Sequence, residues 1–230
     1  MKSPKQKRMT LMVAAIATPM FLFGAIGGIA ESFKAPPEQL IAQAETRLAK
    51  GELSEAEALI LKAEQKLPES AEVATLKANL LFQQDKKEEA LAQFKLAGQK
   101  PGATAMVFQM QAMIHEQLKQ FPEATVALEE ALKREPVNAV IHNNLAMMKL
   151  QQGDRDGAEV NLFRAIQLQP GFPDAHRNLA SLYKDKGLSL DAKRHFEIYL
   201  QLKPDAKERS EIEAWLKANS SAFSTENTPN

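Results

Sequence analysis

The sequence predicts an all-α solenoid of five helix–turn–helix repeats, followed by a capping helix and preceded by one transmembrane helix. Two observations predict the repeats. Pro136, Pro170 and Pro204 recur every 34 positions, and several columns of apolar residues keep the same spacing. A third observation predicts the membrane helix, because residues 10–30 contain no charged side chain.

The segment 10–30 is long enough to cross a bilayer. Its 21 residues would form a helix roughly 31 Å long, about the thickness of the hydrocarbon core. Pro19 would bend this helix, which membrane helices tolerate. The basic residues Lys2, Lys5, Lys7 and Arg8 precede it, and positively charged flanks stay on the cytoplasmic side. We therefore expect a single-pass anchor of a bacterial inner membrane, with a cytoplasmic segment 1–9 and the repeats in the periplasm.

Two further interpretations of this segment stay open. It could be a secretory signal that is removed near Ala30, after small residues, although its apolar core is longer than that of most signals. Gly24 and Gly28 have the spacing that lets two membrane helices approach closely. This spacing would allow a homodimer, but small residues are also common in membrane helices that do not pair.

The repeats are defined by columns of residues that recur every 34 positions. Alanine occupies the first column, a large apolar residue follows four positions later, and a small residue or tyrosine follows three positions after that. The columns are Ala56, Ala90, Ala124, Ala158 and Ala192; Ile60, Phe94, Leu128, Leu162 and Phe196; and Ala63, Ala97, Ala131, Ala165 and Tyr199. Alanine lets two helices cross closely, and the large residue fills the space beside the crossing.

Each repeat also contains an earlier amphipathic stretch, such as residues 140–147, that ends at a turn. Glycine marks this turn at Gly51, Gly153 and Gly187. The second stretch ends at the proline that marks the phase, because proline cannot continue a helix. Each unit is therefore predicted to be two antiparallel helices joined by a short turn.

This pattern resembles the tetratricopeptide repeat family over about residues 37–204. Leu145, Ala146, Gly153, Ala158, Ala165 and Pro170 match the family pattern, as do Leu179, Ala180, Tyr183, Gly187, Ala192, Phe196 and Pro204. The resemblance implies a right-handed solenoid with units at 37–70, 71–104, 105–138, 139–172 and 173–204. The first two units match less well, and Asp85 and Lys119 replace the turn glycine in units two and three.

The chain after the last repeat predicts a cap and a tail. Residues 205–219 contain Ile212, Trp215 and Leu216 among many charges, which indicates a helix that covers the last apolar face of the stack. Residues 220–230 are polar, and we expect this tail to be disordered.

Composition and histidine placement exclude several classes of chemistry. Residues 31–230 carry a net charge of −4, so nucleic acid is not an expected partner. The chain has no cysteine, and it lacks a nucleophile–histidine order and a phosphate-binding glycine loop. His142 and His176 occupy the same position in successive repeats, which accounts for both, and His115 also sits on a core position. We expect no catalytic site, metal or cofactor.

The resemblance instead implies a concave groove, lined by the first helix of each unit, that receives a peptide or a partner helix. Its lining would include Met106, Gln109, Met110, Met113 and Glu116 in unit three; Val140, Asn143, Asn144, Met147 and Leu150 in unit four; and Asp174, Arg177, Asn178, Ser181 and Lys184 in unit five. Methionine adapts to apolar ligands of varied shape, but these methionines could equally fill gaps between repeats. Of the positions with which some relatives grip a chaperone carboxylate, only Asn144 matches, so that ligand is not expected.

These features predict a membrane-anchored adaptor that binds a protein partner in its groove and helps to organise a cell-envelope complex. The alternative is an accessory subunit of a membrane complex, held mainly by its transmembrane helix. An enzyme is a third possibility, against which the resemblance speaks, because the family itself carries no active site.

Overall fold

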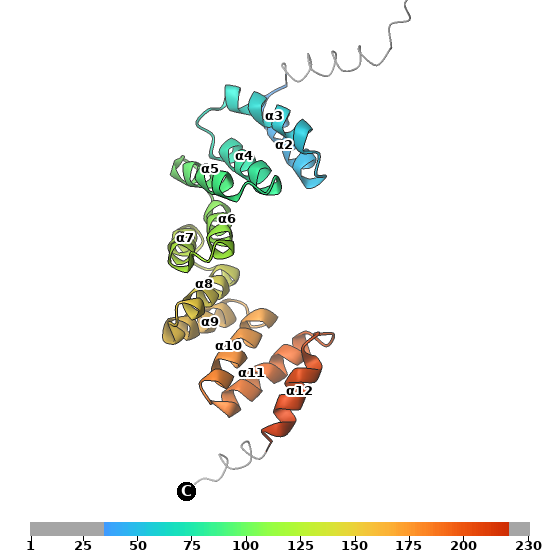
Figure 1. The fold of residues 1–230 in the computed structure, drawn as a ribbon, viewed down its shortest axis with the longest axis vertical. Coiled ribbons are helices and arrows are strands. Elements are labelled where there is room, and N and C mark those ends of the chain that lie inside the picture. The colour runs from blue at the N-terminus through green and yellow to red at the C-terminus, as the bar shows by residue number, and fades with distance from the viewer. Residues whose placement is uncertain (1–34, 221–230) are drawn as a thin grey trace, which may run out of the picture.

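The computed structural model describes residues 35–220, which form eleven α-helices and no β-strand (Figure 1). Ten helices pair into five antiparallel hairpins. We call the first helix of each pair the A helix: α2 (Pro37–Ala49), α4 (Ala71–Gln83), α6 (Ala105–Gln117), α8 (Ala139–Gln151) and α10 (Pro173–Asp185). The B helices are α3 (Leu53–Lys66), α5 (Lys87–Gln99), α7 (Phe121–Arg134), α9 (Arg155–Leu168) and α11 (Ser189–Leu202).

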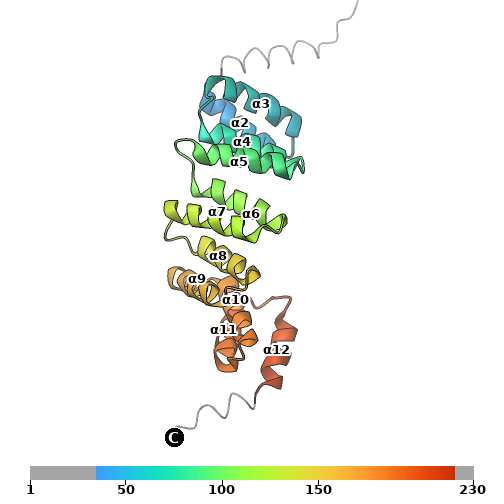
Figure 2. The ribbon, with the colours of Figure 1, turned by 60° about the vertical axis from the view of Figure 1, so that its left-hand side comes forward.

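The hairpins stack in chain order along the long axis of the molecule, so the domain is elongated (Figure 2). Each A helix packs against its own B helix, and each B helix of the first four repeats packs against the A helix of the next. Neighbouring A helices also touch, as α2 with α4 and α8 with α10. This arrangement confirms the all-α stack of helical hairpins that the repeat spacing predicts.

Three helices begin at a residue whose side chain caps the helix, and two A helices begin with proline. Ser70 accepts a hydrogen bond from the backbone N–H of Val73 at the start of α4. Asn138 caps α8 and Asp154 caps α9 in the same way, and Pro37 and Pro173 occupy the first position of α2 and α10. All five A helices, including α6, which has neither a side-chain cap nor a proline at its start, begin at the first residue of their repeat.

The turn between the A and B helices needs a left-handed backbone in every repeat. Gly51, Gly153 and Gly187 have φ angles of 72°, 80° and 75°. Asp85 and Lys119 occupy the same position in units two and three, and each has a φ of 59°. The two departures from the glycine pattern therefore keep the geometry of the turn, at a cost in backbone strain.

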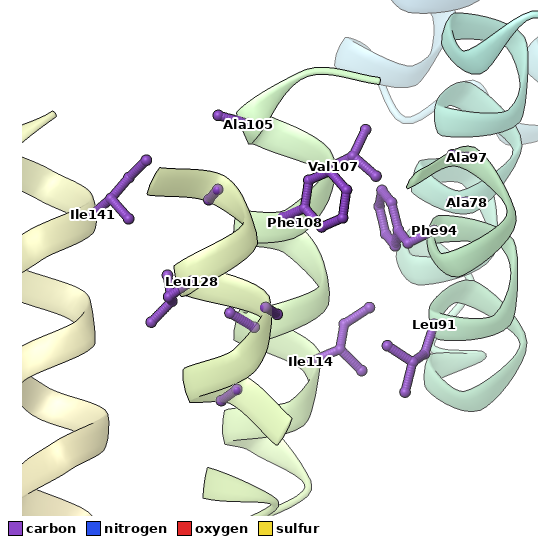
Figure 3. Close-up of a cluster of buried hydrophobic side chains, with 14 of the residues drawn as sticks. Ala78, Leu91, Phe94, Ala97, Ala105, Val107, Phe108, Ile114, Leu128 and Ile141 are labelled. Atoms are coloured by element: carbon purple, nitrogen blue, oxygen red, sulfur yellow. The ribbon is translucent and has the colours of Figure 1, made fainter. Parts of the chain in front are cut away.

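The three columns of small and large residues form the core between the helices. Ala56, Ala90, Ala124, Ala158 and Ala192 are all fully buried, and the large residues of the second column are at most 5% exposed. Figure 3 shows how one repeat packs on the next: Phe94 of α5 faces Val107 and Phe108 of α6. One continuous apolar cluster thus runs from unit two to unit four.

Basic residues at the ends of the first three B helices join each repeat to its own start. Lys66 donates a hydrogen bond to the carbonyl of Ala35 at 2.6 Å. Lys100 bonds to Pro68 at 2.9 Å, and Arg134 bonds to Ala103 at 3.1 Å. These three donors recur at the period of the repeat and form a further column, which was not predicted. Lys66 and Arg134 lie in the last turn of their B helices, and Lys100 is the C-cap residue of α5.

The predicted cap is present as helix α12 (Arg209–Ala218), which begins later than the predicted start at residue 205. It packs beside α11 at the C-terminal end of the stack, as Figure 1 shows. Ile212 is 6% exposed, and the Trp215 ring meets the Phe196 ring edge-on with centroids 5.5 Å apart. Arg209 donates to the carbonyl of Leu200 near the end of α11. The helix therefore covers part of the last repeat, as predicted.

Three predicted segments lie outside the described residues. They are the basic segment 1–9, the membrane anchor at 10–30 with Gly24 and Gly28, and the tail at 220–230 apart from Ser220. Within residues 35–220, no helix is long and apolar enough to cross a membrane.

Because two turns are strained, we predict that glycine at such a turn would raise the stability of the domain. Lys119 is exposed, so Lys119→Gly should remove left-handed strain without loss of a contact. We expect the free energy of unfolding in urea to rise by about 0.5–1 kcal/mol, since glycine's own entropic cost offsets part of the strain relieved. Gly153→Lys is the mirror control, because a Cβ at Gly153 has nothing within 4 Å, and it should destabilise the domain. Equal stabilities of the two variants would contradict this account.

Candidate functional groove

The A helices together line a groove that is made of three hollows. The acidic hollow, about 410 Å³, is lined by Glu45, Ala71, Glu72, Thr75, Leu76, Asn79, Gly102, Thr104, Met106 and Val107. The methionine hollow, about 310 Å³, is lined by Met106, Gln109, Met110, Ala112, Met113, Glu116, Leu128, Asn144, Met147 and Met148. The terminal hollow, about 300 Å³, is lined by Met147, Leu150, Arg177, Asn178, Ser181, Lys184, Phe196, Glu208, Glu211, Ile212 and Trp215.

Shared side chains connect these hollows into one surface. Met106 lines both the acidic and the methionine hollow, and Met147 lines both the methionine and the terminal hollow. The three hollows are therefore neighbours in a row that extends from the first repeat to α12. Every charged group that lines the first two hollows is acidic, whereas the terminal hollow holds two acidic and two basic side chains.

The methionine hollow gathers the groove positions that the repeat count gives for unit three. Met106 is 59% exposed, whereas Met110, Met113 and Met147 are half-buried. Met110 and Met147 also pack against the central apolar cluster, and Met148 is 3% exposed and belongs to that cluster. The methionines thus fill gaps between repeats and line the groove at the same time. Because their side chains are unbranched, this wall can change shape around an apolar ligand.

The terminal hollow also contains four residues of the C-terminal cap, which the sequence analysis did not assign to the groove. Glu208, Glu211, Ile212 and Trp215 come from α12 and its N-terminal turn. If the repeat count is continued to residue 207, these four fall on the second, fifth, sixth and ninth positions, the ones that line the groove in the other units. The helix is therefore both a cap and a sixth groove-lining A helix. The repeat phase of these four residues was the sequence signal from which their place in the groove could have been predicted.

One ion pair and one hydrogen bond attach the start of α12 to α10 and α11. Arg177 contacts Glu208 at 3.2 Å and Asp174 at 3.8 Å. The Tyr199 hydroxyl also donates to Glu208 at 3.1 Å. Hydrogen bonds from the backbone and from Tyr199 lower the pKa of Glu208 below its usual value. Arg177 is thus already paired, while Lys184 lies at the same hollow with an exposed side chain.

Two predicted groove residues are largely buried, although Asn178 also lines the terminal hollow. Asn143 is 6% exposed and Asn178 is 8% exposed. The Asn178 amide donates to the Asn143 side-chain oxygen at 2.9 Å, and the Asn143 amide lies 3.4 Å from the side-chain oxygen of Asn144. Buried amides need partners, so this pair is committed to joining units four and five. Its place between adjacent A helices, at the fifth and sixth repeat positions, explains why the repeat count assigned both to the groove.

Comparison with known proteins identifies the family. A family model described as tetratricopeptide repeat matches residues 41–104 and 110–176, which is more than half of the chain. The chain belongs to the tetratricopeptide repeat family. A comparison of the sequence with curated proteins found no match.

Several solved structures share the fold of this tetratricopeptide repeat protein. A crystal structure of MamA is 18% identical, with a TM-score of 0.64, and the match covers 76% of this chain and 94% of MamA. YrrB, described as a TPR protein with an unusual peptide-binding site, is 21% identical, with a TM-score of 0.64 and coverage of 79% and 93%. PilF of Pseudomonas aeruginosa is 17% identical, with a TM-score of 0.66 and coverage of 85% and 94%. At these identities the likeness concerns the fold.

The histidines of the repeats make structural contacts. His176 Nε2 lies 2.9 Å from the carbonyl oxygen of Pro170, so it must donate there. Its Nδ1 lies 2.9 Å from Nδ1 of His195, so one of these two nitrogens donates to the other. His142, one repeat earlier, lies 3.0 Å from the Asn161 side-chain oxygen, and His115 lies 2.6 Å from that of Gln120. The contact between His176 and His195 joins α10 to α11 and was not predicted.

The described residues 35–220 contain no group of three or more histidine and carboxylate side chains that could hold a metal ion. The groove lining offers apolar, amide and charged side chains, which suit binding.

The paired histidines predict an acid-sensitive stability. Burial, the neighbouring His176 and then Arg194 lower the pKa of His195 from 6.5 to about 4, while Asp191 acts in the opposite direction. The unfolded chain takes up a proton near pH 6.5 and the folded chain does not, so stability should fall as the pH drops from about 6.5 to 4.

Urea denaturation at a series of pH values measures this slope. His195→Gln should flatten it, because glutamine keeps a polar group beside His176 but does not titrate. If the variant and the wild type have the same slope, His195 is not the group responsible.

Proposed function

We propose that this protein is a scaffold that binds a protein partner through the groove and has no catalytic activity of its own. The methionine hollow is the observation that supports this most directly. It combines a wall of adaptable apolar side chains with amide groups at Gln109 and Asn144, the mixture that anchors a peptide and fixes its position. YrrB, which shares the fold, is described as having a peptide-binding site, which supports a peptide as the ligand class.

We further propose that residues 10–30 anchor the protein in a bacterial inner membrane and that the repeats lie in the periplasm. The uncharged segment and the basic residues before it support this topology. On this proposal the groove recruits a partner to a cell-envelope complex. A pairing of two copies through Gly24 and Gly28 would place two grooves side by side.

The alternative is an accessory subunit that is held in a membrane complex by its transmembrane helix. The same uncharged segment favours it. A comparison of the full chain with a variant that lacks residues 1–30 separates the two. If the truncated protein still captures the partner, the groove is responsible; if capture is lost while the domain stays folded, the helix is responsible.

Charge in the methionine hollow should prevent partner capture. The triple variant Met110→Glu, Met113→Glu and Met147→Glu places carboxylates where an apolar side chain would bind, and their desolvation opposes binding. We expect partner recovery in a pull-down from membranes to fall at least about tenfold, the equivalent of about 1.4 kcal/mol.

The control introduces carboxylates at exposed apolar residues on B helices. Val126 is 59% exposed and Val160 is 68% exposed, and neither lines the groove. Val126→Glu with Val160→Glu should leave recovery unchanged, and circular dichroism should show both variants folded. Recovery that survives in the methionine variant would argue against groove binding.

A further inference from the structure

The charges of the groove are arranged unequally along its length. Glu45 and Glu72 line the acidic hollow, and Glu116 lines the methionine hollow. All three are exposed, and among residues 35–220 none of their carboxylates has an ion-pair partner within 4 Å. No basic side chain lines either hollow.

The opposite end of the groove is electrically balanced. Arg177 and Lys184 face the same hollow as Glu208 and Glu211, and Arg177 is already bound to Glu208. A charged ligand therefore gains little from this end. The groove can therefore discriminate between ligands by their charge only in the first three repeats. There the negative potentials of neighbouring carboxylates sum within a concave surface.

We infer that the groove selects a partner segment in which lysine or arginine lies close to a large apolar side chain. The basic group would pair with Glu45 and Glu72, and the apolar group would enter the methionine hollow. This inference rests on the proposed function, and it specifies which side chains the bound segment must carry. It follows from charge complementarity, because the uncompensated carboxylates border the apolar hollow.

The shared wall of the two hollows sets the spacing between these groups. Met106 lines both, so the basic and apolar positions belong to neighbouring repeats. Adjacent helices pack about 10 Å apart, and an extended chain advances about 3.3 Å per residue. The basic residue should therefore lie about three to six residues from the apolar one.

The occupant that we assign is a segment of another protein. Residues 1–9 of this chain are also basic and precede an apolar stretch. On the proposed topology, however, they lie across the membrane from the repeats. Binding of the chain's own N-terminus is accordingly an outcome that the experiment must be able to detect.

The test uses phage-displayed random peptides of about twelve residues, long enough to span two hollows when extended. The target is the full chain purified in mild detergent. Bound peptides are sequenced and the best are remade for fluorescence anisotropy. We expect lysine or arginine to be enriched close to leucine, methionine or phenylalanine. We also expect binding to weaken as salt is raised.

Variants with matched charge identify the carboxylates. Glu45→Gln with Glu72→Gln should weaken the remade peptides about five- to tenfold at low salt and by much less at high salt. Glu88→Gln with Glu89→Gln makes the same change of net charge on exposed residues of α5 and should leave affinity unchanged. Equal effects of the two pairs would overturn the inference, because the carboxylates of the groove would then have no special role.

The remaining outcomes separate this inference from the proposed function. Peptides without a basic excess that lose binding in the methionine variant would support the groove and overturn the charge rule. If no peptide prefers the wild type over the methionine variant, both proposals fail. If a synthetic peptide of residues 1–9 competes with the selected peptides and deletion of residues 1–30 strengthens their binding, the occupant is the chain itself. The assignment to a partner would then be wrong.

Discussion

The close crossing of two helices at a buried alanine is the interaction on which the whole molecule depends. Ala56 and its equivalents in the four later repeats have no exposed surface, and any larger side chain there would separate the A and B helices. Because the crossing is the same in each repeat, the hairpins have the same shape and can stack. The groove is a result of that stacking, since it places one A helix beside the next.

A stack of this kind has only neighbouring contacts, so its stability depends on how each repeat is joined to the next. Apolar packing supplies most of that junction, as Phe94 does against Val107 and Phe108. At the C-terminal end, polar contacts with defined geometry also join the units. The Asn143–Asn178 hydrogen bond joins units four and five, and the ion pair between Arg177 and Glu208 joins unit five to α12. These contacts leave fewer side chains free for a ligand there than in the middle of the groove.

The sequence is sufficient to predict the fold because the period, the alanine columns and the turn residues all repeat. The same period identifies the residues of the methionine hollow, since position in a repeat determines which face of a helix a side chain occupies. The period does not reveal that Asn143 and Asn178 are buried against each other, because that burial depends on the neighbouring unit and a hydrogen bond between two amides has no sequence signature. The contact between His176 and His195 is hidden for the same reason. The groove residues at the start of α12 and within it could have been predicted by continuing the repeat count. The non-helical residues before Arg209 make that continuation hard to recognise in the sequence.

The sharing of Met106 and Met147 between hollows has a thermodynamic consequence. A methionine side chain samples several rotamers, and a ligand that fixes it must offset the entropy lost. When the central hollow is filled, both shared side chains are held still, so groups that enter the flanking hollows meet walls that are already ordered. Occupation of the centre should therefore favour occupation of either end, without any movement of the backbone. A partner that occupies two hollows at once would therefore bind more tightly than the separate affinities of its two parts suggest.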